Sequence, residues 1–581
     1  MTKKHKDFLF FTILLMTVFI VYRKSLGLAL YGDDFLVISK FFGGYGPGKE
    51  LNYYDPRIWI SNYGFQYLTA LLYLVFGLNS LPYYIISLTL RALLAYSIYF
   101  YTSHIFNKKA GILSGLLFAV SSVGAETTDW VYNMNSYIGI FFLLIGLTLI
   151  QQAKTGRSKL KAWVFVITGY IVVPIRLFIV PMMMPLLAAG ERYILIGKKR
   201  FFKPDYLIKT SFIFILTASP FLLLRLTLPS LGWQKVNSEL IGQGILRAQE
   251  MVSAGRYDFL ATPFTNLGRM VVPIGPTQLQ EAGLKVYPLS TFLKTGLLLF
   301  LLGSVYMVFA FTGLSFKTLS LSFLISALFL SFLKIFIRYQ GEWLLKEFSY
   351  FAWTFFGLLT TMIFALLILK SFIRQNKYML FYGVSFVFTF SFLYPWLYSP
   401  GFIFSEKDRY MILPSVGLAM FLGSLLSKMI NKSTFGVRIL TLVLFLFFVV
   451  SQAVNVQRFF KQKLIERTPE LNGIIFDSIM AAVPELPKDY RSVFYFEDFS
   501  PGVSESLLRF GFGYHMQLFY NFPFNEELHP VSLFTYEALE DRVTNEDIPE
   551  DYVFAFRWKD GEILDITKTI RRKLFEGSTR I

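Results

Sequence analysis

Apolar stretches separated by short polar turns recur along the first 456 residues of the 581-residue chain. Crossing the hydrocarbon core of a bilayer takes roughly 17 to 25 apolar residues in a helix. The pattern therefore predicts an α-helical polytopic membrane protein with about thirteen crossings. We place the spans near residues 8–23, 83–102, 110–122, 136–151, 162–175, 177–190, 210–228, 289–312, 318–336, 349–369, 378–396, 411–427 and 439–456.

The pattern changes after residue 456, and no later apolar run is long enough to cross a membrane. Apolar positions recur every three or four residues over 464–483, which predicts a helix. The runs 493–496 and 553–558 are rich in aromatic and β-branched residues and predict strands, the second turning at Lys559-Asp560-Gly561 into a hairpin. We expect residues 457–581 to form a small α/β domain outside the membrane, after a membrane domain over residues 1–456.

Composition supports the membrane class and excludes several kinds of site. The chain is 54% hydrophobic and 16% charged, against about 25% charged for an average soluble domain. It has no cysteine, so disulfides and cysteine-based metal sites or nucleophiles are excluded. The four histidines, His5, His104, His515 and His529, show no metal-ligand spacing. We predict no cofactor, although the acidic residues leave room for a divalent metal.

The net charge of +18 raises the question of nucleic-acid binding. Lysine and arginine, however, gather in alternate turns between the predicted spans, as the positive-inside rule requires of cytoplasmic loops. This distribution predicts a cytoplasmic N-terminus and an extracytoplasmic C-terminal domain, and it leaves no role for a nucleic-acid partner. The basic residues of the predicted cytoplasmic turns include Lys3, Lys4, Lys6, Lys108, Lys109, Lys198, Lys199, Arg200, Lys428 and Lys432.

Two long external loops follow from this topology. The first, residues 24–82, begins just after the first span, carries Asp33 and Asp34, and contains a predicted juxtamembrane helix over residues 65–76. Adjacent acids at a membrane boundary are candidates for function because their desolvation is costly. The alternative is a helix cap or an exposed turn. The second loop, residues 229–289, is much longer than a typical connection and is expected to cover a site.

Further charged residues lie on the same predicted side of the membrane. Glu126 and Asp129 form a second acidic loop that can converge with the first on one substrate, with Trp130 as an interfacial anchor. Arginines lie at or near the external ends of spans, where a guanidinium can pair with phosphate oxygens or extend to the surface. They are Arg91, Arg176, Arg338 and Arg409.

Several short motifs resemble a known family. Asp33-Asp34, Phe76-Gly77-Leu78-Asn79, Leu117-Phe118-Ala119-Val120 with Glu126 and Trp130, and Arg409-Tyr410 resemble the class C (GT-C) membrane glycosyltransferases. The likeness is strongest to the protein O-mannosyltransferases, including the transmembrane type with tetratricopeptide repeats. Residues 8–190 carry most of it. The chain departs from the family in lacking repeats of about 34 residues, and in having Arg91 where the family commonly has a histidine.

The resemblance implies an enzyme that transfers a hexosyl or pentosyl group from a polyprenyl-phosphate carrier to a hydroxyl of a protein, lipid or glycan acceptor. It implies that Asp33 or Asp34 is the catalytic base. Glu126 and Asp129 would bind sugar or acceptor hydroxyls, while Tyr410 and the four arginines would bind the donor. The expected location is the plasma (inner) membrane, in contact with membrane lipid.

Two other classes remain open from the residues alone. A transporter or flippase for a lipid-linked or small anionic solute would use similar arginines and acids, but near the midplane of the membrane and within repeated spans. The acids here cluster outside the spans, and no two-fold repeat is evident. A non-catalytic scaffold that displays the C-terminal domain would explain neither acidic loop.

Overall fold

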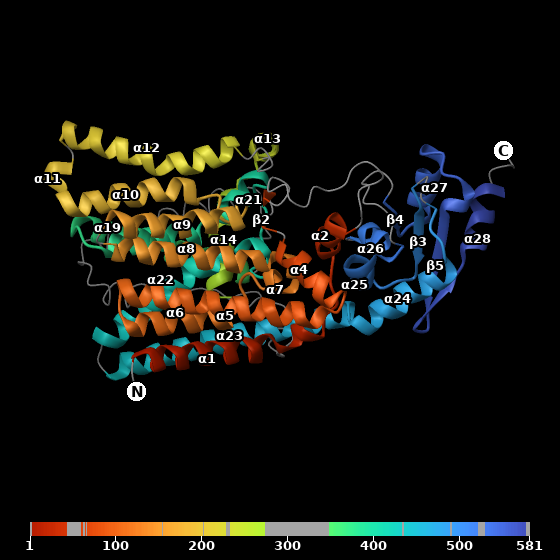
Figure 1. Ribbon diagram of the computed structural model, residues 1–581, viewed down its shortest axis with the longest axis horizontal. Helices are drawn as coiled ribbons and strands as arrows, with labels where there is room; N and C mark the ends of the chain where they lie inside the picture. The colour runs from red at the N-terminus through yellow and green to blue at the C-terminus, as the bar shows by residue number, and fades with distance from the viewer. Residues whose placement is uncertain are drawn as a thin grey trace.

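The computed structural model describes residues 3–42, 60–61, 64–65, 67–153, 155–201, 203–227, 233–272, 348–432, 435–487, 491–509, 511–520 and 529–576. Figure 1 shows an elongated bundle of helices, with a smaller part containing a β-sheet at the end where the C-terminus lies. The predicted spans near 289–312 and 318–336, and Arg338, lie outside the described residues.

Each of the remaining predicted spans overlaps a helix, and the span near 378–396 falls on two. Seven of the described helices are long and apolar enough to cross a membrane. The chain is therefore a mainly helical, multi-pass membrane protein, as the sequence predicted. The bundle helices are α1 (Lys3–Tyr22), α5 (Ser80–Ile105), α6 (Lys108–Val120), α8 (Asn135–Gln152), α9 (Gly156–Val172), α10 (Val180–Ile196), α12 (Pro204–Thr227), α19 (Phe348–Ile373), α20 (Tyr378–Thr389), α22 (Ile412–Lys432) and α23 (Phe435–Glu466).

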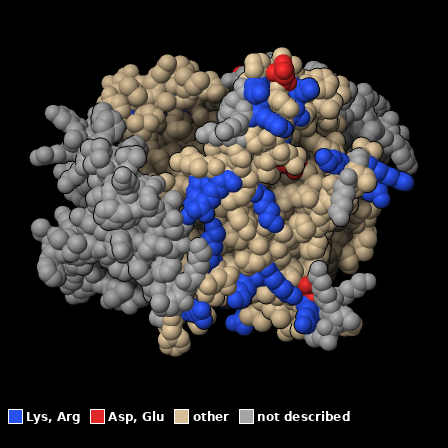
Figure 2. Space-filling view, turned by 90° about the vertical axis from the view of Figure 1, so that its left-hand side faces the viewer, with Lys and Arg blue, Asp and Glu red and all other residues tan. Residues whose placement is uncertain are grey.

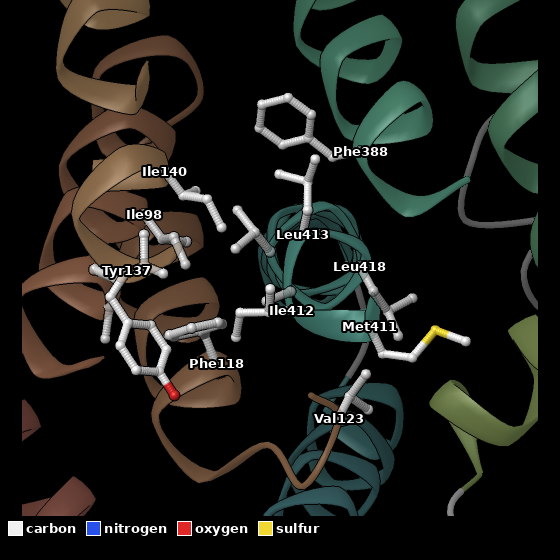
Figure 3. Packing of buried hydrophobic residues seen from close by; sticks show 14 of the residues in the cluster. Ile98, Phe118, Val123, Tyr137, Ile140, Phe388, Met411, Ile412, Leu413 and Leu418 are labelled. Atoms are coloured by element: carbon white, nitrogen blue, oxygen red, sulfur yellow. The ribbon is translucent and has the colours of Figure 1, made fainter. Parts of the chain in front are cut away.

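The packing centre of the bundle is α22, whose apolar stretch is far more enclosed than that of the peripheral α12. Figure 3 shows Ile412 and Leu413 of α22 facing Phe118 of α6 and Tyr137 and Ile140 of α8. All five side chains are at most 1% exposed. Because these residues lie close in sequence to the loop with Glu126 and Asp129 and to the loop before α22, the same packing fixes where those loops leave the bundle.

The other elements of this part lie mainly at the end of the bundle nearer the sheet. They are η1 (Arg23–Gly27), α2 (Asp33–Phe42), β1 (Ile60–Ser61), β2 (Gly64–Phe65), α4 (Tyr67–Phe76), α7 (Glu126–Asp129), η2 (Val131–Met134), α13 (Trp233–Ser253), η4 (Asp258–Leu260), α14 (Thr262–Val271), α21 (Leu393–Tyr398) and η5 (Arg409–Met411), with α11 (Lys198–Phe201) at the opposite end. The predicted juxtamembrane helix is α4. Its Leu71, Leu74 and Val75 are exposed, as an apolar face lying on a membrane surface would be.

The predicted span 378–396 is interrupted in the structure, because α20 ends at Thr389 and α21 begins at Leu393. Ser391 Oγ donates a hydrogen bond to the carbonyl of Phe388 (2.8 Å) in the break. Hydropathy measures how long an apolar run is, and it does not detect a local break in the hydrogen-bond ladder.

The C-terminal part is an α/β unit, as predicted. Its sheet has the order β4-β3-β5-β6, in which β3 (Val493–Glu497) is parallel to β4 (Val531–Leu533) and β5 (Val553–Lys559). Strand β6 (Glu562–Asp565) returns antiparallel to β5 through the predicted turn, where Asp560 and Gly561 both have positive φ. The associated helical elements are α24 (Pro469–Ala482), α25 (Pro501–Val503), η6 (Ser504–Arg509), α26 (Phe512–Phe519), α27 (Tyr536–Asn545), η7 (Glu550–Tyr552), α28 (Thr567–Arg571) and η8 (Arg572–Glu576).

Alternation along β3 supplies two apolar layers to this unit. Phe494 and Phe496 pack with residues of α24 and α26, whereas Val493 and Tyr495 pack with residues of α27 and α28. The sheet is thus covered on both faces, an arrangement typical of α/β folds.

The predicted helix over residues 464–483 is wrong at its start. Helix α23 continues from the membrane part to Glu466, and a separate helix, α24, begins at Pro469. Proline lacks the N–H that a helix interior needs and is favoured in the first turn. Thr468 caps α24 by accepting a hydrogen bond from the Leu471 N–H (3.1 Å).

The two ends of the bundle differ in charge. Figure 2 views the end remote from the sheet, where lysine and arginine side chains are numerous and acidic ones are few. In this region Lys108 lies 3.8 Å from Asp7, and Lys109 donates to Asn431 (3.0 Å). The two acidic loops and the C-terminal sheet are at the other end. The positive-inside rule would place that end outside the cytoplasm, and this orientation stays a prediction.

This orientation predicts the result of a fusion experiment. Alkaline phosphatase joined after Ile581 should be active in a bacterial inner membrane, because it would be exported. Phosphatase inserted after Gly197, between α10 and α11, should be inactive, whereas a fluorescent protein there should be bright. The reverse pattern would place the acidic loops in the cytoplasm.

Candidate active site

Asp34 lies at the start of α2 and is held by two backbone donors. Its side chain is 0% exposed. The Tyr31 N–H donates to Asp34 Oδ2 (3.0 Å) and the Tyr132 N–H donates to Oδ1 (2.7 Å). Such bonds are charge-assisted, so they stabilise the carboxylate and fix its orientation. Asp33 is the first residue of the same helix.

The two acidic loops meet around this carboxylate. Trp130 Nε1 donates to the Tyr31 carbonyl (2.9 Å), and the rings of Trp130 and Tyr31 lie 5.1 Å apart. The Tyr84 hydroxyl on α5 is close to the carbonyls of Ala29 (3.2 Å) and Asp129 (3.0 Å). Segments about 100 residues apart in the sequence are therefore in direct contact, so the two acidic loops that the sequence placed on one side do lie together.

Glu126 lies against the loop that precedes α22. Its Oε2 accepts a hydrogen bond from the Arg409 N–H (3.3 Å), and its own N–H donates to the Lys407 carbonyl (2.8 Å). Burial, together with the negative charges of Asp408 and Asp129, raises the pKa of Glu126 to about 7. Near neutral pH this carboxyl can therefore accept or donate a hydrogen bond to a hydroxyl.

Asp129 is paired inside the protein with a residue that the sequence did not suggest. Its carboxylate accepts from Arg467, which follows α23 directly, and the two side chains are 5% and 1% exposed. The guanidinium Cζ also lies 4.3 Å from the centre of the Tyr31 ring. No local motif marks Arg467, because its partner is 338 positions away in the chain.

Two of the predicted arginines flank Tyr410. Arg176 Cζ lies 4.3 Å and Arg409 Cζ lies 5.5 Å from the centre of its ring, and Arg409 Cζ lies 4.0 Å from the Trp130 ring. Arg176 Nη2 donates to Asn133 Oδ1 (3.1 Å), while its buried Nη1 has no hydrogen-bond partner within the described part of the chain. Two cations therefore lie close to the second acidic loop, and one of them keeps a donor unpaired within the described residues.

Arg91 lies apart from this pair and is 0% exposed. Its Nη2 donates to the carbonyls of Ser121 (2.7 Å) and Phe118 (3.4 Å), and its Nη1 to the Tyr137 hydroxyl (3.3 Å). The last carbonyls of a helix have no partner within the helix, so Arg91 satisfies the end of α6. Its observed contacts are structural, and donor binding by Arg91 stays a prediction.

A buried polar network holds the second acidic loop against the bundle. Glu406 pairs with Arg269 of α14 (3.0 Å) and accepts from Asn455 of α23 (3.2 Å). The Glu406 carbonyl accepts from the Gly124 N–H (2.8 Å), and Gln452 of α23 accepts from Ser122. The loop expected to cover the site thus contributes Arg269. Within the described residues no three acidic or histidine side chains form a group that could hold a metal.

His515 of α26 provides a contact between the C-terminal part and α2, and its ring stacks on Phe35 with centroids 3.7 Å apart. Burial lowers the pKa of His515 well below its usual 6.5. Above about pH 6.5 the imidazole is neutral in both the folded and the unfolded chain. Below that pH the unfolded chain gains a proton that the folded one does not, so stability should fall by up to about 1.4 kcal/mol per pH unit.

His515→Phe should reduce this decline between pH 6.5 and 5.5, measured as the shift of the melting temperature of the purified protein. His5→Gln, at an exposed position of α1, is the control and should behave like the parent. Equal pH dependence in parent and His515→Phe would show that His515 does not contribute.

The family model of dolichyl-phosphate-mannose-protein mannosyltransferases matches residues 63–224. This stretch includes Glu126, Asp129 and Arg176, and the match confirms the resemblance to the protein O-mannosyltransferases that the sequence predicted. No curated protein matches the chain.

Solved structures that are similar to this chain include the following two. The archaeal oligosaccharyltransferase AglB from Archaeoglobus fulgidus, in complex with an inhibitory peptide and a dolichol-phosphate, aligns with a TM-score of 0.47 and 12% identity, over 96% of this chain and 69% of that one. ArnT from Cupriavidus metallidurans bound to undecaprenyl phosphate aligns with a TM-score of 0.31 and 11% identity, over 96% of this chain and 94% of that one.

Proposed function

We propose that this chain, part of which matches the mannosyltransferase family model, transfers a monosaccharide from a polyprenyl-phosphate carrier to an acceptor hydroxyl on the extracytoplasmic side of the plasma membrane. The observation that carries the proposal is the fixed carboxylate of Asp34. This carboxylate lies where the two acidic loops meet. Arg176 contacts the second loop by its hydrogen bond to Asn133, and Arg409 contacts it by lying over the Trp130 ring. A transferase of this kind needs a base for the acceptor and cations for the leaving phosphate.

The reaction is a substitution at the anomeric carbon of the sugar. The acceptor oxygen forms a bond to that carbon while the bond to the phosphate oxygen breaks, and its electron pair stays on the polyprenyl phosphate. The hydroxyl proton passes to the carboxylate of Asp33 or Asp34, which later releases it to water. General base catalysis of this kind typically contributes about 10² to 10⁴ in rate.

The arginine pair supplies the other half of the chemistry. The leaving phosphate gains negative charge as the bond breaks, and a guanidinium can stabilise it with two parallel hydrogen bonds. Arg176 Nη1 is available within the described residues for one such bond. Tyr410, between the two guanidinium groups, keeps them in place through cation–π contacts. Glu126 would accept or donate a hydrogen bond to a sugar or acceptor hydroxyl.

Purified protein in liposomes, incubated with radiolabelled polyprenyl-phosphate hexoses and pentoses and with peptide, lipid and glycan acceptors, tests the proposal. We expect one donor to be consumed, with the label appearing on one acceptor class. Failure to consume any donor by a stably folded protein would contradict the proposed activity.

A further inference from the structure

The C-terminal part of the molecule contacts the loop that carries Asp34. Arg467 stands at the junction between α23 and α24, and its side chain reaches back into the membrane part. Its Nη2 donates to the Asp129 carbonyl (3.1 Å) as well as to the carboxylate. Its Cζ lies 4.3 Å from the Tyr31 ring centre. One side chain therefore contacts both acidic loops.

These contacts lie next to the two donors that hold Asp34. Tyr31 is contacted by Arg467 through its ring and donates to Asp34 through its N–H. Tyr132, the second donor, is three residues beyond Asp129, in the 3-10 turn that follows α7. Trp130 ties the two segments together by donating to the Tyr31 carbonyl. A shift of Arg467 would thus be passed to both oxygens of Asp34.

The C-terminal domain also packs directly against the start of α2. Gly511, which precedes α26, has φ of +77°, and a Cβ atom there would lie 2.2 Å from the Gly32 carbonyl oxygen. Phe35 of α2 stacks on His515 of α26. The domain therefore contacts the start of α2 directly, in addition to the contact of Arg467 with Tyr31, which precedes this helix.

The buried Arg467–Asp129 ion pair is expected to add little to the free energy of unfolding. Removing two charges from water costs about as much as their attraction returns, so buried pairs are often replaceable by apolar residues. Arg467 also keeps buried Nε and Nη1 groups with no hydrogen-bond partner among the described residues, which adds to the cost. What the pair does supply is a fixed geometry between segments distant in the sequence.

We propose that Arg467 is a positioning residue through which the C-terminal domain holds both acidic loops in the arrangement needed for transfer. The inference rests on the proposed function and deepens it, since it gives the domain a part in the reaction. It predicts that Arg467 acts on the rate of the chemical step through Asp34 and has no contact with the donor.

The test compares Arg467→Gln with Arg557→Gln. Arg557 is the matched control because it pairs with Glu497 (2.5 Å) within the sheet of the same domain, away from the acidic loops. Arg467→Gln should lower kcat at least about tenfold, because a misplacement of 1 Å can cost about a hundredfold. KM for the donor should change little. Hydrogen exchange of the Tyr31 and Tyr132 amides, followed by mass spectrometry, should accelerate only in Arg467→Gln.

Arg467→Lys should recover part of kcat, because lysine keeps the charge but not the planar fork. Arg467→Gln alone leaves the buried carboxylate of Asp129 without its ion-pair partner. If that variant does not fold, the double variant Arg467→Gln with Asp129→Asn removes this charge, and its kcat and amide exchange are measured instead. Parent-like kcat and amide exchange in folded Arg467→Gln, or equal losses in Arg557→Gln, would overturn the inference. An inactive parent would instead contradict the proposed function, while the amide exchange would still report on positioning.

Discussion

Asp34→Asn should reduce sugar transfer at least about a hundredfold. If Asp34 is the base, the variant lacks the group that accepts the proton. If Asp33 is the base, the variant should still lose activity. In the parent the N–H groups of Tyr31 and Tyr132 both donate to Asp34. In the variant the amide NH₂ would face one of these N–H groups, so two donors would oppose each other. The loss should appear in kcat, because the phosphate contacts are unchanged, and a single-turnover assay with labelled donor measures it.

Asp33→Asn separates the two assignments, because it leaves the bonds to Asp34 intact. A rate close to the parent in Asp33→Asn identifies Asp34 as the base, whereas a hundredfold loss with normal melting temperature identifies Asp33. If both variants transfer sugar at the parent rate, neither aspartate is the base and the mechanism is wrong.

Removal of the arginines should weaken donor binding. Arg176→Ala and Arg409→Ala should each cost about 1.5 to 3 kcal/mol, the value of a hydrogen bond to a charged group. This is about a 10- to 150-fold increase in Kd for the polyprenyl-phosphate sugar. Titration of the labelled donor into purified protein in detergent measures it.

Arg200→Ala is the control for this prediction, because Arg200 is an exposed arginine of α11 at the opposite end of the bundle. Its donor affinity should equal that of the parent. Unchanged affinity in both Arg176→Ala and Arg409→Ala would remove the arginine pair from the donor site.

The membrane architecture was predictable because an apolar run of the length of the bilayer is a strong and local signal. Breaks in helices were less predictable. The end of α23 near Arg467 had a usable signal in Thr468 and Pro469, which favour a helix start. For the break between α20 and α21, the nearest sequence signal was Pro395, which lies within α21, after the break.

The membrane topology predicted which residues of the site lie on the same side of the membrane, and nothing finer. Residues on the same side of the membrane can meet, and this argument brought Asp34 near Asp129. It could not choose partners. Arg91 was expected to pair with phosphate oxygens or to extend to the surface, yet it is buried and donates to the carbonyls of Ser121 and Phe118. The pairing of Asp129 with Arg467 depends on how a separate domain docks, which no local pattern encodes.

The most direct test of the proposed transfer is the fate of the bond between the sugar and the phosphate. Proteoliposomes would be loaded with a polyprenyl-phosphate sugar labelled in both the sugar and the phosphate, and an acceptor would be added outside. The proposed mechanism predicts free polyprenyl phosphate in an amount equal to the glycosylated acceptor, and almost none in Asp34→Asn. Movement of the intact donor across the bilayer, with the bond unbroken and the acceptor unmodified, would contradict it and indicate a transporter.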